Sequence, residues 1–242
     1  MIRALKLQYK LYFMEAFGLF IFMVSACFFG AMLEHPNSNW HHAIPNAFLR
    51  LVIMGFAMGS TALFIFLSPS TAPSGSFINP ALTITRYRLN QINFEDTVWY
   101  CIFQLLGGLF GVYFMSWLMG NYLTDPEINY MVTVPGKDVS AIIAALVETL
   151  IAFVMITAVL FISNNEKLKK STPFVAAFIV CLDVIVAGPI SGFGMNPART
   201  LASAIPAHTY TDIWIYMVCP FVGMLGAAEV FVWYLKRHDK FI

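Results

Sequence analysis

Two segments of the chain place an Asn-Pro-Ala triplet inside apolar sequence. The segments read SGSFINPALT and SGFGMNPART, and their triplets are Asn79, Pro80, Ala81 and Asn196, Pro197, Ala198. Asparagine is a favoured helix N-cap and proline is favoured at the first helical position, so each triplet predicts the start of a helix. An asparagine amide fixed at such a start can donate an N–H hydrogen bond. A water or alcohol oxygen held between the two asparagines would accept from both.

Three ionisable residues also stand alone among apolar neighbours. Glu15 lies in FMEAFGLF, Glu148 lies in LVETLIAF, and Arg199 directly follows the second triplet. Each carboxylate can accept hydrogen bonds from backbone N–H groups of a loop that lipid could not satisfy, and the alternative is a proton relay. A functional role is expected for Arg199 in such surroundings. The alternative, a side chain that reaches the surface, is expected for Arg86 and Arg88.

The composition indicates an integral, multi-pass membrane protein. Hydrophobic residues make up 59% of the 242 residues, charged residues make up 11%, and the mean hydropathy is +0.73. Soluble domains carry about 25% charged residues. The four cysteines are scattered singly without a CxxC or a Cys/His cluster, so no metal site, cofactor or disulfide framework is predicted. The net charge of +1 indicates no nucleic-acid partner.

Six stretches are long and apolar enough to cross a bilayer as helices, which takes roughly 20 residues. They cover residues 11–33, 46–67, 97–119, 140–162, 172–190 and 212–235. If these spans alternate in direction, eleven of the fourteen lysines and arginines fall on one side, before residue 11 and within 86–88, 167–170 and 236–240. Cytoplasmic loops carry such an excess, so both termini are predicted to be cytoplasmic.

The chain repeats itself approximately over residues 1–120 and 136–242. Each half has three spans, a lone glutamate in its first span and a triplet before its third. Because three is odd, the halves must cross the membrane in opposite directions. The helices predicted at 80–88 and 197–204 are too short to span, and broken helices in inverted repeats are a transport architecture. The predicted fold is an all-α membrane protein, one channel domain over 1–242, with six transmembrane helices and two half-helices in two inverted three-helix repeats.

The paired segments SGSFINPALT and SGFGMNPART, together with Glu15 and Glu148, resemble the major intrinsic protein family of aquaporins and glycerol facilitators. The resemblance covers the whole chain apart from its termini. It implies a pore in each subunit, two half-helices that meet at the triplets, and assembly as a homotetramer. It also implies that Arg199 is the arginine of the family's selectivity filter, which donates hydrogen bonds to solute oxygens and repels cations.

The resemblance implies three further filter positions. Phe193 lies three residues before the second triplet, where glycerol facilitators also carry phenylalanine, and Val184 lies twelve before it, where water-specific members usually carry histidine. The fourth position is Gly59 by counting back from the first triplet, or Met58 if the family's glycine is aligned. Asp183 precedes Val184, and the sequence leaves open whether it touches the pore or a helix interface.

These features predict a passive channel that conducts water and small neutral solutes such as glycerol and excludes protons and ions, in the plasma or cytoplasmic membrane. A strictly water-selective aquaporin is the alternative, because Thr200 stands where glycerol facilitators usually have aspartate. An ion-coupled secondary transporter would also use inverted repeats, but the triplets supply amides rather than clustered acids. The sequence shows no convergent nucleophile, metal-ligand set or acid pair, so no enzymatic activity and no catalytic residue are predicted.

Overall fold

The computed structural model describes residues 1–238, and of Ile2 and Arg3 it describes only the backbone. Lys240 and the side chain of Arg3, which were counted on the predicted cytoplasmic side, lie outside the described part. Every regular element in the described part is helical. The long helices are α1 (Ile2–Glu34), α3 (Ala47–Leu67), α5 (Phe94–Met119), α7 (Ala141–Ser163), α8 (Thr172–Val186) and α11 (Ile213–Arg237). The shorter helices are α2 (Asn39–Ala43), α4 (Pro80–Arg88), α6 (Asn121–Thr124), α9 (Gly188–Ser191) and α10 (Pro197–Ala207), with single 3-10 turns at 72–74, 129–131 and 169–171.

Among the described residues, five helices are long and apolar enough to cross a membrane, and they match five of the six predicted spans. The remaining prediction, 172–190, corresponds to α8, which has only 15 residues, followed by α9. Pro189 has no N–H and interrupts the helix there. Ala187 keeps helical dihedral angles, donates to the Asp183 carbonyl at 2.8 Å and accepts from the Ser191 N–H at 2.8 Å. The two helices therefore continue one another over about 30 Å, enough for a crossing.

The long helices are apolar on their outer surfaces as well as at their contacts. The exposed large hydrophobic side chains include Phe56, Phe110, Trp117, Leu146 and Val186. Helices that are hydrophobic all round belong inside a large core or a bilayer, and these side chains are not in a core. The chain is therefore an integral, multi-pass membrane protein.

The helices pair in the same way in the two halves. The first and third long helices of each half pack together, as α1 on α5 and as α7 on α11. A glycine lies at each contact. A Cβ at Gly107 of α5 would lie 2.0 Å from the Ala16 carbonyl oxygen, and one at Gly223 of α11 would lie 2.3 Å from the Thr149 carbonyl oxygen. Ala16 and Thr149 directly follow the two lone glutamates. The small residues thus allow the backbones to approach closely, as expected for membrane helices, and they do so at equivalent places in the two repeats.

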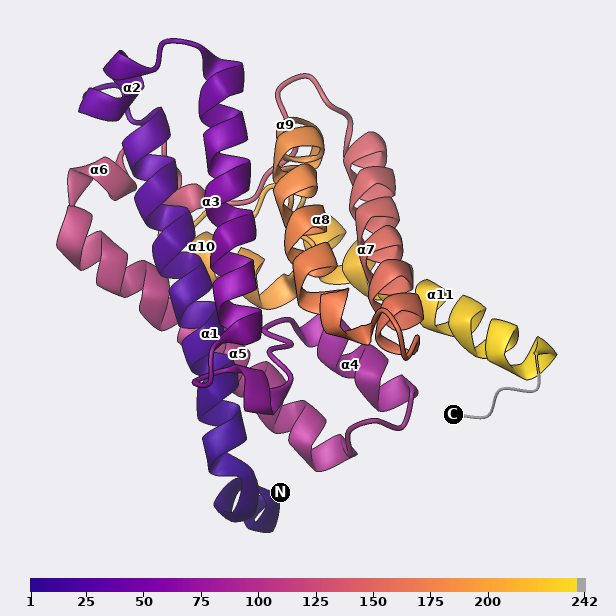
Figure 1. The fold of residues 1–242 in the computed structure, drawn as a ribbon. Coiled ribbons are helices and arrows are strands. Elements are labelled where there is room, and N and C mark those ends of the chain that lie inside the picture. The colour runs from indigo at the N-terminus through magenta and orange to yellow at the C-terminus, as the bar shows by residue number, and fades with distance from the viewer. Residues whose placement is uncertain (239–242) are drawn as a thin grey trace.

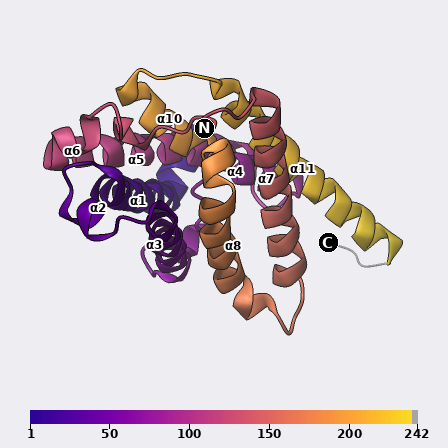
Figure 2. The ribbon, with the colours of Figure 1, turned by 90° about the horizontal axis from the view of Figure 1, so that it is seen from above.

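The half-helices α4 and α10 begin at the two triplets, in the middle of the bundle. They contact one another, and in Figure 1 α4 lies in the lower part of the molecule toward the N-terminus, with α10 above it. Seen from above, α4 lies with α1 and α3 on one side and α7 and α11 on the other (Figure 2). The bounds of α4 match the prediction of 80–88, and α10 extends three residues beyond the predicted 197–204.

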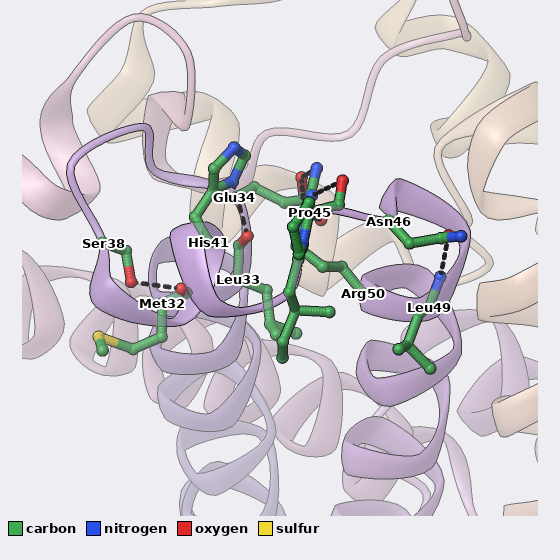
Figure 3. Close-up of polar contacts among 10 residues, drawn as sticks. Met32, Leu33, Glu34, Ser38, His41, Pro45, Asn46, Leu49 and Arg50 are labelled. Carbon is green, nitrogen blue, oxygen red and sulfur yellow. Dashed lines mark hydrogen bonds and ion pairs between the residues drawn. The ribbon is translucent and has the colours of Figure 1, made fainter.

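The connection from α1 to α3, at the end of the molecule that carries α2, is held by polar contacts (Figure 3). Ser38 donates to the Met32 carbonyl oxygen at 2.5 Å. Arg50 is 6% exposed, and its Nη2 lies 3.0 Å from the Glu34 Oε2. Its Nη1 also donates to the Pro45 carbonyl oxygen at 3.1 Å. This buried arginine therefore has both a carboxylate and backbone oxygens around its charge.

Candidate functional site

Each triplet forms the N-cap of its half-helix. The Asn79 Oδ1 accepts from the Ala81 N–H at 2.9 Å, and the Asn196 Oδ1 accepts from the N–H groups of Ala198 and Arg199 at 3.1 and 3.2 Å. Proline occupies the first helical position in both. The amide oxygens are thus used for capping, so the NH₂ groups are directed away from the half-helices.

The amide nitrogens of the two asparagines each bind the loop of the opposite repeat. The Asn79 Nδ2 donates to the Met195 carbonyl oxygen at 2.9 Å, and the Asn196 Nδ2 donates to the Ile78 carbonyl oxygen at 2.7 Å. Since each NH₂ group has two hydrogens, one N–H per asparagine is left for the cavity between the half-helices. The free donors were expected from the sequence, but the reciprocal contact was not, because it depends on two residues more than 100 positions apart.

Glu15 holds the loop that precedes α4. The carboxylate is fully buried, and its Oε1 accepts from the Phe77 N–H at 3.0 Å and the Ser74 hydroxyl at 2.6 Å. Its Oε2 accepts from the Ile78 N–H at 2.6 Å and the Gln104 Nε2 at 2.7 Å. Four donors therefore surround one charge, and two of them are the backbone N–H groups that lipid could not satisfy.

Glu148 holds the loop that precedes α10 in the same way. Its Oε1 accepts from the Gly194 N–H at 2.8 Å and the Ser191 hydroxyl at 2.7 Å, and its Oε2 accepts from the Met195 N–H at 2.6 Å. Neither glutamate is among the described residues that line the central cavity. The hydrogen bonds and this position support the loop-holding interpretation over a proton relay.

A pair of tyrosines adds a contact that the sequence reasoning missed. The Tyr100 hydroxyl donates to the Ser74 carbonyl oxygen at 2.9 Å, and the Tyr216 hydroxyl donates to the Ser191 carbonyl oxygen at 2.5 Å. The available signal was the spacing, because the two tyrosines follow the asparagines of their triplets by nearly equal intervals, 100 − 79 = 21 and 216 − 196 = 20 residues.

The loops turn their carbonyl oxygens to a different side from their N–H groups. In the described structure no hydrogen bond reaches the carbonyl oxygens of residues 75–77 or 192–194, whereas the next N–H groups bind the glutamates. The backbone has positive φ at Ser76 (49°), Ile78 (43°), Phe193 (50°) and Met195 (44°), in addition to the preceding glycines. Residues 75–77 and 193–194 line the cavity, so each loop offers it a row of acceptors.

Arg199 is 8% exposed, and it lines the cavity from the first turn of α10. Its Nη1 donates to the Met131 carbonyl oxygen at 3.1 Å and to the Thr133 hydroxyl. The loop between α6 and α7 supplies both partners, with φ values of 42°, 56° and 55° at residues 129–131. The sequence did not indicate these partners, because nothing in the loop's composition marks it as a contact to α10.

The central cavity has a volume of about 290 Å³ and brings together Asn79, Asn196, Phe193 and Arg199 from the predicted set. Arg86 also lines it, at an end where the hydrogen bond from its Nη1 to the Gln91 Oε1 is exposed. The expectation of a side chain that reaches the surface did not include the cavity, which continues along α4 as far as Arg86.

Gly59, one of the two candidates for the fourth filter position, faces the neighbouring helix α8. A Cβ there would lie 2.8 Å from the Cys181 Cβ and 2.9 Å from the Ala177 carbonyl oxygen, so Gly59 allows α3 to approach α8. Met58 is 2% exposed and belongs to the same buried apolar cluster as Val184. Neither of these two side chains lines the cavity in the described structure.

Asp183 lies half-buried on α8 and is also outside the cavity lining. Its Oδ2 is buried without a hydrogen-bond partner among the described residues. Asp183 therefore does not line the cavity, and its Oδ2 does not have the polar partner that the helix-interface interpretation called for among the described residues.

A bundle of membrane-crossing helices around a cavity, with two half-helices that meet at its polar centre, defines a membrane channel. The profile of the family described as major intrinsic protein matches residues 2–231. The chain belongs to the major intrinsic protein family, a family of channels for water and small neutral solutes.

Individual relatives agree with this assignment. A probable NIP-type aquaporin of Nicotiana alata is 32% identical over 65% of this chain and 57% of its own length, which is less than two thirds of that relative. The probable aquaporin TIP2-2 of Oryza sativa subsp. japonica is 32% identical over 73% of this chain and 70% of its own length. The X-ray structure of the aquaglyceroporin from Plasmodium falciparum has the same fold, with a TM-score of 0.77 at 19% identity over 92% of this chain and 95% of that one.

Proposed function

We propose that the pore conducts water and small neutral solutes such as glycerol and excludes protons and ions. The observation that carries the proposal is the separation of donors and acceptors along the cavity. One N–H of each asparagine is free at the centre, and unpartnered carbonyl oxygens lie in the loops on either side. The names of the two relatives, both aquaporins, support water as a permeant.

This arrangement orients water as it passes. At the centre, the water oxygen accepts from the free N–H groups of Asn79 and Asn196, so its own hydrogens point away toward neighbouring waters and the carbonyl rows. The water there cannot accept a proton from one neighbour while it passes another on. The N-termini of α4 and α10 add roughly half a positive charge each, which raises the free energy of a cation at the centre.

The outer part of the pore sets the size and polarity of the solute. Arg199 offers hydrogen-bond donors and Phe193 offers an apolar surface, which together suit a solute with one hydroxyl edge and one carbon edge. We assign Met58 and Val184 to the wall behind this constriction, because both are buried in one apolar cluster beside it. A strictly water-selective channel is the alternative, and a polar cavity centre by itself favours neither.

Stopped-flow light scattering of proteoliposomes tests the proposal, with water flux and glycerol flux measured separately. We expect both to exceed those of empty vesicles. Unchanged osmotic water permeability would overturn the channel proposal, and water flux without glycerol flux would leave the water-selective alternative. Solute uptake that depends on an ion gradient would instead favour a coupled transporter.

We also propose that the chain forms a single channel domain, with repeats at 1–120 and 136–242, and that it assembles as a homotetramer with both termini in the cytoplasm. The paired glutamate, tyrosine and glycine contacts support the repeat, and the basic segment at 167–170 supports the orientation. Chemical cross-linking in membranes tests the tetramer. Labelling of the lysines in this segment tests the orientation, since they should react only when the cytoplasmic face is exposed.

A further inference from the structure

One end of the central cavity carries an arginine that the pore described so far does not use. Arg86 lies seven residues after Asn79 on α4, and it lines the cavity together with Phe77 and Thr172. The guanidinium carbon of Arg86 is 5.6 Å from the centre of the Phe77 ring, and its Nη1 donates to the Gln91 Oε1 at 2.6 Å. We call this end of the cavity the α4 mouth.

The two arginines that line the cavity both lack a carboxylate partner in the described part of the chain. Among the described residues, Arg50 and Arg88 form ion pairs with Glu34 and Glu229, and both lie outside the cavity. Arg86 and Arg199 line the cavity, and neither is in an ion pair of the described chain. Arg237 is also in no described ion pair, but it lies outside the cavity and its guanidinium carbon is 5.3 Å from the centre of the Trp233 ring.

The Arg86 Nε is also buried without a hydrogen-bond partner among the described residues. Arg86 is partly buried, and a charge in such a place without a counter-charge is costly, so its position at the pore indicates a use for the charge itself.

We propose that Arg86 is a second charge filter, which repels cations at the α4 mouth in series with Arg199. The proposal rests on the proposed channel function. Asn79, Leu82 and Arg86 follow one another at helical spacing and all line the cavity, so the half-helix that begins at a pore amide ends at a pore charge. A cation that passed either arginine would still meet the other. A neutral solute would meet hydrogen-bond donors at both.

Arg88 provides the matched control. It is two residues from Arg86, which is about 200° around the helix, and it points to α11 instead of the cavity. Its Nε lies 2.8 Å from the Glu229 Oε1, and both side chains are about half exposed, at 51% and 53%. Replacing Arg88 removes the same charge from the same turn of α4 without changing the charge that faces the pore.

A cysteine reporter at Thr172 measures the local potential at the α4 mouth. The rates of its modification by an anionic sulfonatoethyl and a cationic trimethylammonium-ethyl methanethiosulfonate are compared, with the parent protein as the background of the native cysteines. We expect Arg86→Leu to lower the ratio of anionic to cationic rates by about fivefold or more. Arg86→Lys should retain the ratio, and Arg88→Leu should leave it unchanged. Equal ratios in Arg86→Leu and Arg88→Leu would overturn the proposal.

A second measurement does not need the reporter. Potassium leak is compared in proteoliposomes that contain Arg199→Gln alone or with Arg86→Leu or Arg88→Leu. We expect Arg86→Leu to raise the leak about fivefold or more over Arg199→Gln, and Arg88→Leu to add nothing. No added leak from Arg86→Leu would overturn the proposal. Water permeability of the wild-type vesicles distinguishes failure of the proposed channel from failure of the second filter. Its absence refutes the channel, whereas its presence together with no effect of Arg86→Leu refutes only the second filter.

Discussion

Replacing Glu148 by glutamine should weaken the fold and the pore together. The glutamine Oε1 can keep the hydrogen bonds from the Gly194 N–H and the Ser191 hydroxyl. Its NH₂ group then faces the Met195 N–H, which now donates to the Glu148 Oε2 at 2.6 Å. A buried donor without an acceptor costs about 1–3 kcal/mol, so we expect a loss of about 2 kcal/mol in the free energy of unfolding. For a chain of this size that corresponds to a fall of about 4–8 °C in the melting temperature.

The assay combines thermal unfolding in detergent with osmotic water permeability in proteoliposomes. Glu229→Gln is the matched control, because Glu229 is also a glutamate on a long apolar helix but is exposed and, within residues 1–238, forms its ion pair with Arg88. We expect the control to lower the melting temperature by no more than about 2–4 °C, since exposed ion pairs contribute about 0–1 kcal/mol. If Glu148→Gln melts and conducts like Glu229→Gln, the carboxylate does not hold the loop and the reasoning fails.

Three further substitutions test other contacts. Gly107→Ala should strongly reduce the yield of folded protein in size-exclusion chromatography, because its Cβ would meet a backbone oxygen at 2.0 Å. Gly226→Ala should behave as wild type, because its Cβ would be 3.7 Å from the nearest side chain. Phe193→Ala should raise the flux of glycerol and larger polyols relative to water in the stopped-flow assay, and lipid-exposed Val222→Ala should not. An unchanged ratio of polyol flux to water flux in Phe193→Ala would remove Phe193 from the constriction. Tyr216→Phe should cost about 1 kcal/mol through the lost hydrogen bond, seen as a melting temperature lower by about 2–4 °C, and no change would show that the loop does not depend on it.

The sequence predicted those parts of the molecule that depend on local signals. Asn79 and Asn196 cap the half-helices as their triplets indicate, because N-capping needs only the residue and the two or three that follow it. The spans followed from apolar length, since lipid leaves a helix no other way to satisfy its backbone. Even the interrupted crossing at 172–190 was correctly placed, although Pro189 divides it into α8 and α9.

The parts that the sequence did not predict depend on direction in space. The contact of each asparagine with the opposite loop joins residues on two repeats, and no local pattern encodes which carbonyl an amide will reach. Gly59 and Met58 are adjacent, and only the rotation of α3 about its own axis determines which of the two faces the backbone of α8. Arg86 and Arg88 look alike in the sequence because both end a short helix in basic residues. Their roles differ because the two side chains leave α4 in different directions, one toward the cavity and one toward α11.

The two re-entrant loops link the stability of the fold to the conduction pathway. Non-glycine residues at positive φ cost about 1–2 kcal/mol each, and each loop contains two of them. Hydrogen bonds to a carboxylate contribute about 1.5–3 kcal/mol each, so the two backbone donors on each glutamate offset this strain. The same backbone turn that directs these N–H groups to the glutamate leaves the neighbouring carbonyl oxygens facing the cavity. If a glutamate releases its loop, the strain can relax and the carbonyl row turns away from the pore. Loss of stability and loss of water permeability should therefore occur together in Glu148→Gln, since both follow from one backbone conformation.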